Sequence, residues 1–417
     1  MDQTTKKVVE FPSECSEDVL TTVLRNGARE MLGRAIQTEV AEYLEARQEL
    51  RDPDGRRQIV RNGYFPRRTI QTPLGEVPVK QPRVRDRRPV PEREKFESSI
   101  LPPYLRKTRS LEELLPWLYL KGISTGDFSE ALQALLGPEA RGLSASTITR
   151  LKADWEEEQK DWARRSLASK TYVYVWADGV YFNVRLEDPG NQRQCILVLM
   201  GATPEGRKEL IAVSDGYRES EQSWKEMLLD LRSRGLRLDP KLAIGDGAMG
   251  FWAAVRKVWP ATREQRCWVH KTANVLNRMP KSLHAKAKGM LHDIWMAETK
   301  REAEGALTLF AETFGAKYPG AVECLQKDRN TLLTFYDFPA EHWRHLRTSN
   351  PIESTFATVR LRTNKTKGSG SRAACLAMVF KLVQAAQKRW RALNGSQRVA
   401  DVIEGVTFVD GLEKKAA

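Results

Sequence analysis

The 417-residue sequence has no apolar run approaching the roughly 18 to 20 residues that cross a bilayer. Its opening residues, Met-Asp-Gln-Thr-Thr-Lys-Lys, lack the apolar stretch of a signal peptide. Only five cysteines are present, and no two are closely spaced, which argues against a disulfide framework. No internal repeat or low-complexity tract is visible. These absences argue against membrane-spanning and disulfide-rich secreted proteins, and we expect a soluble protein of the reducing cytoplasm.

Acidic residues are outnumbered, since 54 Asp and Glu stand against 68 Lys and Arg, for a formal net charge of +14. Such a balance favours a polyanionic partner, and nucleic acid fits better than an acidic membrane surface. The length exceeds that of one ordinary core, so we expect two or three folding units. Charge alone says nothing about the fold.

Residues 1–55 form the first expected unit, a helical N-terminal region. Apolar residues recur there at helical spacing, and Asp52-Pro-Asp-Gly55 ends the segment as a turn. Residues 56–109 follow, in which Asn62-Gly63, Leu74-Gly75 and an alternating pattern predict one or two short β-hairpins.

The second half of this region is a basic, proline-rich arm. Between residues 80 and 109, ten basic residues stand against four acidic ones, and prolines favour an extended chain. We interpret it as an arm that follows DNA phosphates, with Arg83 and Arg85 as candidate contacts. A solvated linker is the alternative.

Residues 110–165 predict three short helices separated by small-residue turns. This pattern resembles a helix-turn-helix, whose last helix enters the major groove of DNA. Arg150 and Lys152 lie on the exposed side of that last helix and are candidate DNA contacts. A plain three-helix packing unit is the alternative.

Strand-like stretches dominate the next region, residues 170–275. Three β-rich stretches suggest an antiparallel meander, and a helix, a strand, a helix and a strand follow. The strands are expected at 171–178, 180–186, 194–200, 241–246 and 265–269, and the helices at about 220–235 and 248–258. This order, with an acid at the end of two strands, is that of the first part of a ribonuclease H-like α/β core.

The rest of the chain is mainly helical. Residues 276–346 predict an all-helical insertion, and residues 347–395 predict the second part of the core, with helices that begin near Ser349 and Ala373. Residues 396–417 form a weakly specified tail.

Two acids end predicted strands. Asp178 interrupts an apolar, β-rich stretch, and Asp246 lies between two glycines, which allow close approach of backbone or substrate. Carboxylates on fixed strand ends suit the two divalent cations that catalyse phosphoryl transfer on DNA. For each residue, an ordinary turn role is the alternative.

A third acid, Glu353, opens a predicted helix. Asn350 fits the N-cap and Pro351 the first helical position, so Glu353 also fits a capping box. The order of the three acids favours a metal site, since 246 − 178 = 68 residues separate the first two and 353 − 246 = 107 residues, including the helical insertion, separate the last two.

A basic strip follows Glu353. From residue 354 to residue 372 there is no acid, and the candidate phosphate contacts are Arg360, Arg362, Lys365 and Lys367. A soluble basic loop is the alternative. The strip's Gly-Ser-Gly-Ser at 368–371 is no Walker loop, so nucleotide hydrolysis is not indicated.

Cys267-Trp-Val-His270 places sulfur and imidazole at metal-ligand spacing. No second ligand pair stands nearby at zinc-finger spacing, so packing against the core is the favoured interpretation. Cys267, His270 and Asn350 remain candidates for supporting the acids from a second layer.

These motifs together resemble the mutator-type transposases of bacterial insertion sequences, over almost the whole chain. The matching motifs occur in the family's order: Trp176-Ala-Asp178-Gly-Val-Tyr181, Gly245-Asp246-Gly247, Arg266-Cys-Trp-Val-His270-Lys and Asn350-Pro-Ile-Glu353-Ser354.

The resemblance implies a DDE transposase in which Asp178, Asp246 and Glu353 hold Mg²⁺, with Mn²⁺ as a substitute. It implies cleavage that leaves a free 3′-hydroxyl, attack of that hydroxyl on target DNA, and a circular intermediate. It also implies N-terminal regions that bind the terminal inverted repeats, a homodimer on paired ends, and a place at the nucleoid.

Two other functions share part of this pattern. A DNA-binding regulator would have an α/β domain that binds a ligand or another copy, and its acids would be dispensable. A ribonuclease H-like nuclease such as a junction resolvase would use the acids but need no separate end-binding region.

Overall fold

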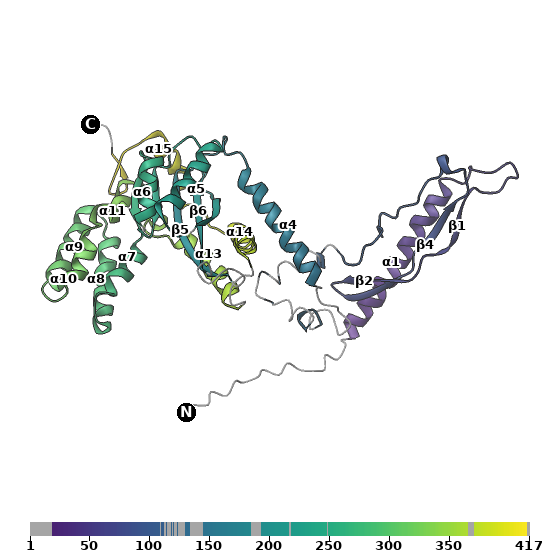
Figure 1. Ribbon diagram of the computed structural model, residues 1–417, viewed down its shortest axis with the longest axis horizontal. Helices are drawn as coiled ribbons and strands as arrows, with labels where there is room; N and C mark the ends of the chain where they lie inside the picture. Colours follow the sequence, from purple (N-terminus) through teal and green to yellow (C-terminus); the bar gives the residue numbers. More distant parts are fainter. Residues whose placement is uncertain are drawn as a thin grey trace, which may run out of the picture. The chain divides into compact units, whose positions relative to one another are not determined.

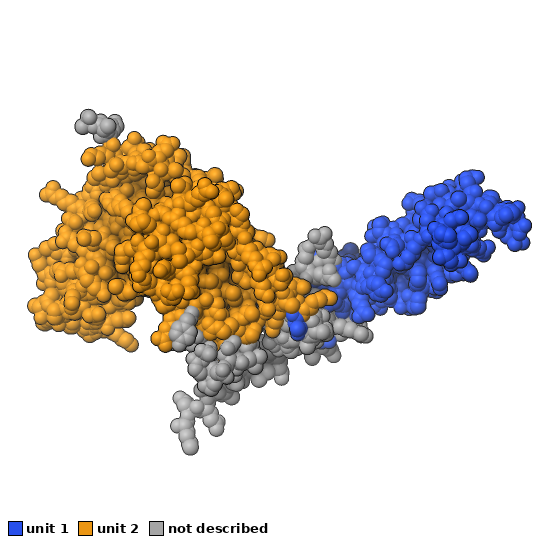
Figure 2. All heavy atoms as spheres, turned by 45° about the horizontal axis from the view of Figure 1, so that its top comes forward, with its two compact units in different colours: residues 1–149 blue, residues 150–417 orange. Residues whose placement is uncertain are grey.

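The computed structural model describes residues 19–108, 110, 111, 114, 118, 120, 123, 130–133, 145–184, 193–216, 218–247, 249–365 and 371–414. The chain divides into two compact units, Met1–Thr149 and Arg150–Ala417, coloured separately in Figure 2. The middle of the predicted three-helix region at 110–165, residues 112–144, lies largely outside the described residues. Its last helix is described as α4 (Ala145–Arg164).

The smaller unit packs one long helix against paired strands. Helix α1 (Val19–Glu45) precedes β1 (Ile59–Tyr64), β2 (Arg68–Thr72), β3 (Gly75–Val79) and β4 (Pro82–Asp86). Strand β2 pairs with β3, and β1 pairs with β4, each antiparallel. A small core of Ile36, Ile70, Val77, Val79 and Leu101 joins α1 to the β2–β3 pair.

The predicted helix and a hairpin at Leu74-Gly75 are confirmed, but the prediction of a turn at Asn62-Gly63 is wrong. Both residues lie inside β1, where Gly63 has a φ of 68° and the pairing with β4 shifts between Arg61 and Tyr64. A glycine in the left-handed region accommodates a bulge as well as a turn, so the dipeptide alone does not distinguish them.

A five-stranded mixed sheet organises the larger unit, in the order β7-β6-β5-β8-β9. Strands β5 (Tyr174–Asn183), β6 (Arg193–Ala202) and β7 (Lys208–Gly216) form an antiparallel meander. Strands β8 (Leu242–Gly245) and β9 (Arg263–Arg266) continue the sheet in parallel with β5. Helices α5 (Glu221–Ser233) and α6 (Met249–Val258) connect them.

The predicted order of elements is confirmed, but the strands that make it up differ. The stretches expected at 171–178 and 180–186 form the single strand β5, because Gly179 continues the pairing with β6 rather than turning. The third strand of the meander is β7, which was not predicted. Its run Leu210–Val213 is buried.

Helices cover both faces of this sheet (Figure 1). Val175 and Ala177 of β5 share a core with α5 and α6. Tyr174 and Trp176, which alternate with them, point to the other face, where they bond to His342 and to the carbonyl of His345. Helices α13 (Asn350–Lys365) and α14 (Arg372–Gln387) also contact the sheet.

The segment between β9 and α13 is helical, as predicted. It contains α7 (Trp268–Leu276), α8 (His284–Met296), α9 (Lys300–Phe314), α10 (Pro319–Gln326), α11 (Arg329–Leu332) and α12 (Trp343–Leu346). Figure 1 shows α8, α9 and α10 as a group beside the sheet. No helix in the described ranges is both long and apolar enough to cross a membrane.

The C-terminal residues are more ordered than predicted. Helix α15 (Val399–Glu404) and the short pair β10 (Phe408–Val409) and β11 (Leu412–Glu413) follow α14. The carbonyls of Gly395 and Gly411 accept bonds from His342 Nε2 and the Ala340 amide. These hydrogen bonds fix the C-terminal residues to the helical segment. Such long-range contacts could not be predicted from the composition of residues 396–417.

Candidate active site

Asp178 and Asp246 lie on neighbouring strands. Ala177 pairs with Gly245 in the parallel register of β5 and β8, so the two acids occupy the next positions side by side. Asp246 directly follows β8, as predicted. Asp178 does not end its strand, since β5 continues to Asn183; it lies where the pairing with β8 stops.

Asp178 is shielded from water, with 6% of its surface exposed. Burial, and then the charge of Asp246, raise the pKa of Asp178 to about 7, while the charge of His270 acts in the opposite direction. Its Oδ1 accepts a 2.9 Å hydrogen bond from the Gly179 amide. The shielded Asp178 carboxylate and the half-buried Asp246 carboxylate repel each other unless a cation lies between them.

Glu219 is a further acid at this site, and the sequence interpretation missed it. It lies between β7 and α5, and its carboxylate occupies the space that a side chain at Gly179 would need. Burial, and then Asp246, raise the pKa of Glu219 to about 7. A glycine directly after a shielded strand acid was the available signal, because it allows another group to approach closely.

Glu353 reaches the site from the first turn of α13. The carbonyl of Ser349 accepts bonds from the amides of Ile352 (2.9 Å) and Glu353 (3.1 Å), so the cap position is Ser349 and the prediction of Asn350 as N-cap is wrong. The Ser349 amide donates to Cys267 Sγ at 3.3 Å. Since that donor is already used, Glu353 is not the acid of a capping box.

Cys267 marks a junction between a strand and a helix. A strand was expected at 265–269, but β9 ends at Arg266 and α7 begins at Trp268. The Cys267 amide still donates to the Gly245 carbonyl of β8 (2.8 Å), whereas its own carbonyl accepts from the Lys271 amide (3.0 Å). Helical bonding therefore starts as soon as the sheet pairing stops.

The helical turn from Cys267 brings His270 beside Glu353, with 3.5 Å between His270 Nδ1 and Glu353 Oε1. A hydrogen bond with Cys267, and then the charges of Cys267 and Glu353, raise the pKa of His270 against the opposing effect of burial. Burial alone would raise the pKa of Cys267, but the bond to His270 holds it below its ordinary value.

His270 connects the acids electrostatically, because its charge acts on Asp178, Glu219 and Glu353. Among the described residues, one set of three potential ligands has all its ligand atoms within 4.8 Å of one another, namely Cys267, His270 and Glu353. The carboxylates of Asp178, Asp246 and Glu353 do not all lie within 4.8 Å of one another.

A basic pocket adjoins the acids. The guanidinium of Arg266 fills the space beside Gly247, which has a φ of 87° and follows Asp246. Arg266 and the fully buried Lys271 both pair with Asp328. The pocket between α7 and α10 is lined by Arg266, Lys271, Asn274, Asn277, Arg278, Cys324 and Lys327.

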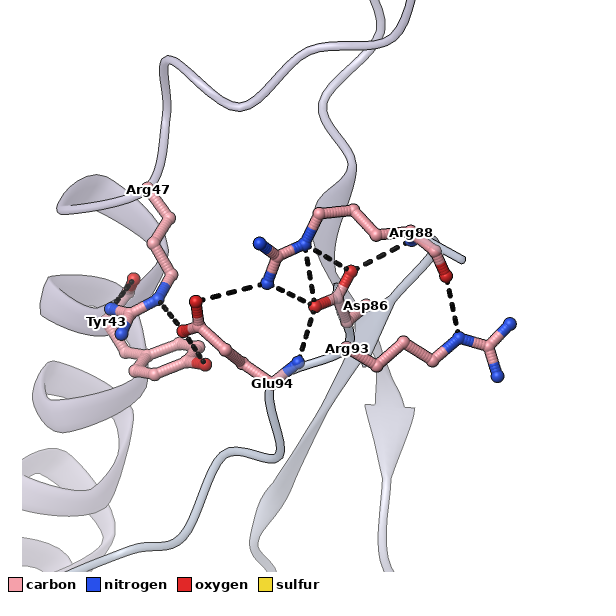
Figure 3. Close-up of polar contacts among 6 residues, drawn as sticks. All are labelled: Tyr43, Arg47, Asp86, Arg88, Arg93 and Glu94. Atoms are coloured by element: carbon pink, nitrogen blue, oxygen red, sulfur yellow. Dashed lines mark hydrogen bonds and ion pairs between the residues drawn. The ribbon is translucent and has the colours of Figure 1, made fainter. Parts of the chain in front are cut away.

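The smaller unit contains two kinds of arginine: some are exposed to solvent, and others bond to acidic residues within the unit. Arg83, Arg85 and Arg87 alternate along the exposed side of β4 and its exit. Arg88, in contrast, donates two hydrogen bonds from Nε and one from Nη2 to the carboxylate of Asp86, and Glu94 joins this network to Arg47 (Figure 3). The predicted candidates Arg83 and Arg85 are therefore available to a ligand.

The remaining basic candidates lie on helices of the larger unit. Arg150 and Arg360 are exposed on α4 and α13, and Lys152 on α4 is half-buried. Lys367 and the side chains of Arg362 and Lys365 lie outside the described residues.

Comparison with known proteins gives a consistent result. The model of the family "Transposase, Mutator family" matches residues 2–392. The chain is 54% identical over 301 residues to the transposase for insertion sequence element IS6120 of Mycolicibacterium smegmatis, covering 72% of this chain and 92% of that protein. It is 53% identical over 283 residues to the transposase for IST2 of Acidithiobacillus ferrooxidans, covering 68% and 95%.

Among solved structures, the Drosophila P element transposase strand transfer complex matches at a TM-score of 0.28 and 9% identity, over 71% of this chain and 85% of that one. The family model, which spans most of the chain, and relatives at more than half identity decide the classification. This chain belongs to the Mutator family of transposases.

Proposed function

We propose that the chain is an insertion-sequence transposase that binds the terminal inverted repeats of its element and cleaves and joins DNA with Asp178, Asp246 and Glu353. The observation that carries this proposal is the adjacent placement of Asp178 on β5 and Asp246 directly after β8. Family membership supports the ends of an insertion sequence as the substrate, because relatives are named as transposases for insertion sequence elements.

The donor set fits a divalent cation. Asp178 and Glu219 are carboxylates whose pKa values burial raises toward neutrality, and the charge of Asp246 raises both further. A hard cation would relieve that repulsion, and carboxylate oxygens are the ligands that Mg²⁺ and Mn²⁺ favour. Asp178 and Asp246 would hold the ion from the sheet, and Glu353 would hold it from α13.

When bound, such ions activate the attacking oxygen of water or of a 3′-hydroxyl and stabilise the leaving oxygen of the phosphodiester. The protein's own part is to fix its carboxylates on rigid elements and to limit their contact with water. Sheet pairing fixes Asp178, and the helix start at Ser349 fixes Glu353. His270 supplies positive charge beside Glu353.

DNA binding would be divided between the two units. Arg83 and Arg85 present cations along an exposed strand edge, which suits contacts to the phosphates of an inverted repeat. Arg150 and Lys152 on α4 would contact DNA as part of the predicted helix-turn-helix. Arg360, Arg362, Lys365 and Lys367, which follow Glu353 in the sequence, would contact DNA phosphates beside the acids, as would the α7 pocket. We propose a homodimer, since two ends must be joined at one target.

The test is cleavage of duplexes that carry the element's own ends, with Mg²⁺ or Mn²⁺. Asp178→Asn and Glu353→Gln should abolish cleavage and leave end binding intact, because each keeps its size and loses only its charge. Asp230→Asn is the matched control, since Asp230 is exposed on α5, where its side chain pairs with Arg234 in the next turn. Cleavage that survives in both acid variants would overturn the catalytic assignment.

Deletion of the smaller unit distinguishes a transposase from a simple nuclease. Under this proposal, residues 150–417 alone lose sequence-specific end binding. A nuclease of the resolvase kind would retain its substrate recognition.

A further inference from the structure

Ser349 lies at the centre of the contacts between Glu353 and the Cys267–His270 pair. It is fully buried, and its hydroxyl oxygen lies 2.8 Å from Glu353 Oε1, 3.3 Å from Cys267 Sγ and 3.4 Å from His270 Nδ1. We infer that Ser349 is a positioning residue that holds the Glu353 carboxylate, and that Cys267 and His270 hold Ser349 in turn.

The available donors fit one consistent arrangement. A serine hydroxyl has one proton, and its shortest contact is to Glu353 Oε1, so it donates there. The Ser349 amide donates to the Cys267 sulfur at 3.3 Å. His270 Nδ1–H then points toward the Ser349 oxygen at 3.4 Å and the Glu353 oxygen at 3.5 Å.

A metal ion among Cys267, His270 and Glu353 is the competing interpretation, because their ligand atoms lie within 4.8 Å of one another. The position between them, however, is taken by the Ser349 hydroxyl. Zinc would need bonds of about 2.0 to 2.3 Å to the same three atoms, and the hydroxyl would have to leave. The contacts favour a hydrogen-bonded cluster over a metal site.

The cluster joins elements that are distant in sequence. Cys267 and Ser349 are 82 positions apart, and the Trp268 amide also donates to the Arg347 carbonyl at 3.0 Å. These hydrogen bonds join the first turn of α7 to the first turn of α13, the turn that carries the Glu353 side chain. This gives the Cys267-Trp-Val-His270 motif a role in the site that needs no metal.

The inference rests on the proposed role of Glu353 as a metal ligand. Groups that orient a ligand typically contribute about 10- to 100-fold in metal affinity or activity. Ser349→Ala should therefore weaken Mn²⁺ binding to the whole protein by about 10- to 100-fold, measured by electron paramagnetic resonance of free Mn²⁺. The same variant should need more Mn²⁺ for half-maximal cleavage, with a smaller loss of turnover at saturating metal.

Two further serine variants isolate the hydroxyl. Ser349→Thr keeps the hydroxyl and should restore most of the Mn²⁺ affinity. Ser354→Ala is the matched control, because Ser354 is exposed on the same helix, where its hydroxyl donates to the Pro351 carbonyl. Wild-type Mn²⁺ affinity in a folded Ser349→Ala protein would overturn the inference.

If Ser349→Ala does not fold, Cys267→Ala, which removes the sulfur that accepts the Ser349 amide, decides the question. It should weaken Mn²⁺ binding in the same direction, and an unchanged affinity would overturn the inference. Added Co²⁺ tests the competing metal site: a near-ultraviolet thiolate-to-cobalt band that disappears in Cys267→Ser would contradict the hydrogen-bonded cluster, and no such band is expected.

Failure of the proposed function would look different. If Glu353→Gln bound Mn²⁺ and cleaved DNA as wild type does, the metal role of Glu353 itself would be wrong. If Glu353→Gln is inactive and only Ser349→Ala behaves as wild type, the positioning role alone is wrong.

Discussion

Asp86 in the smaller unit and Asp178 in the larger unit are both shielded carboxylates, but their surroundings differ. Asp86 accepts three hydrogen bonds from the Arg88 guanidinium and two more from the amides of Arg88 and Glu94 (Figure 3). Asp178 lies next to Asp246, with Glu219 nearby. The pKa of Asp86 is depressed chiefly by the Arg88 bonds, and that of Asp178 is raised by burial.

The contrast separates an acid that stabilises its fold from an acid that, under the proposed function, would bind a metal ion. A satisfied carboxylate contributes to folding, whereas repelling carboxylates cost stability and persist where they serve a function. Replacing an acid by its neutral amide should therefore lower the stability of the smaller unit at Asp86 and raise the stability of the metal-free larger unit at its site.

Replacing an acid on the sheet gives the largest expected effect. Asp246→Asn should reduce end cleavage to background and raise the free energy of unfolding without metal by about 1 kcal/mol or more, because it removes a repulsion that raises two neighbouring pKa values. Cleavage assays and thermal unfolding in chelator test both parts. If Asp246→Asn lost stability as well as activity, the idea that repulsion between these carboxylates lowers the stability of the metal-free protein would be wrong.

Glu219→Gln should also weaken metal binding and stabilise the metal-free protein, with smaller effects than Asp246→Asn. We expect Mn²⁺ affinity to fall by about tenfold, as for groups just outside the metal, while the metal-free protein becomes more stable. Titration with Mn²⁺ measures the first change and calorimetry the second. Glu226→Gln on the exposed face of α5 is the control, and it should change neither quantity.

Asp86→Asn should have the opposite effect on stability. The change removes the acceptor of the Arg88 bonds, so the smaller unit should melt several degrees lower, while the larger unit is unaffected. Hydrogen exchange across β1 and β4 locates the loss. Asp54→Asn, whose pair with Arg56 is exposed at the surface, should leave the exchange unchanged.

Arg83→Ala and Arg85→Ala should weaken end binding without changing stability. Each removed phosphate contact should lower the slope of log affinity against log salt by about one. Binding measured over a series of salt concentrations gives that slope. Arg56→Ala in the turn before β1 is the control, and an equal loss there would show that only net charge matters.

The pH dependence of the smaller unit gives the mildest test. Because the pKa of Asp86 is depressed in the folded state, its contribution is complete above the ordinary aspartate pKa of about 4 and is lost as pH falls below that value. As pH falls from about 4 to about 2, the free energy of unfolding of the smaller unit should fall more steeply in the wild type than in Asp86→Asn. Equal steepness would mean that Asp86 is not the responsible group.

Local sequence patterns predicted where single acids lie in the fold better than they predicted which residues contact those acids. Asp246 follows its strand as expected, since a short apolar run and flanking glycines define that end. Glu219 was missed because its approach to Asp178 depends on β7, an unpredicted strand, and on the missing side chain at Gly179. Likewise, Ser349 became the helix start only because the Cys267 sulfur, 82 positions away, accepts its amide.

The tie between Cys267 and Ser349 has a consequence for synthesis of the chain. The sheet and the basic strands of the smaller unit are complete in sequence long before residue 349 is made, whereas Glu353 is placed by a contact that spans the whole helical segment. A nascent or truncated chain that ends before this point would carry the end-binding strands without the third carboxylate. Under the proposed function, such chains would occupy the element's ends without cutting them and so restrain the full-length enzyme.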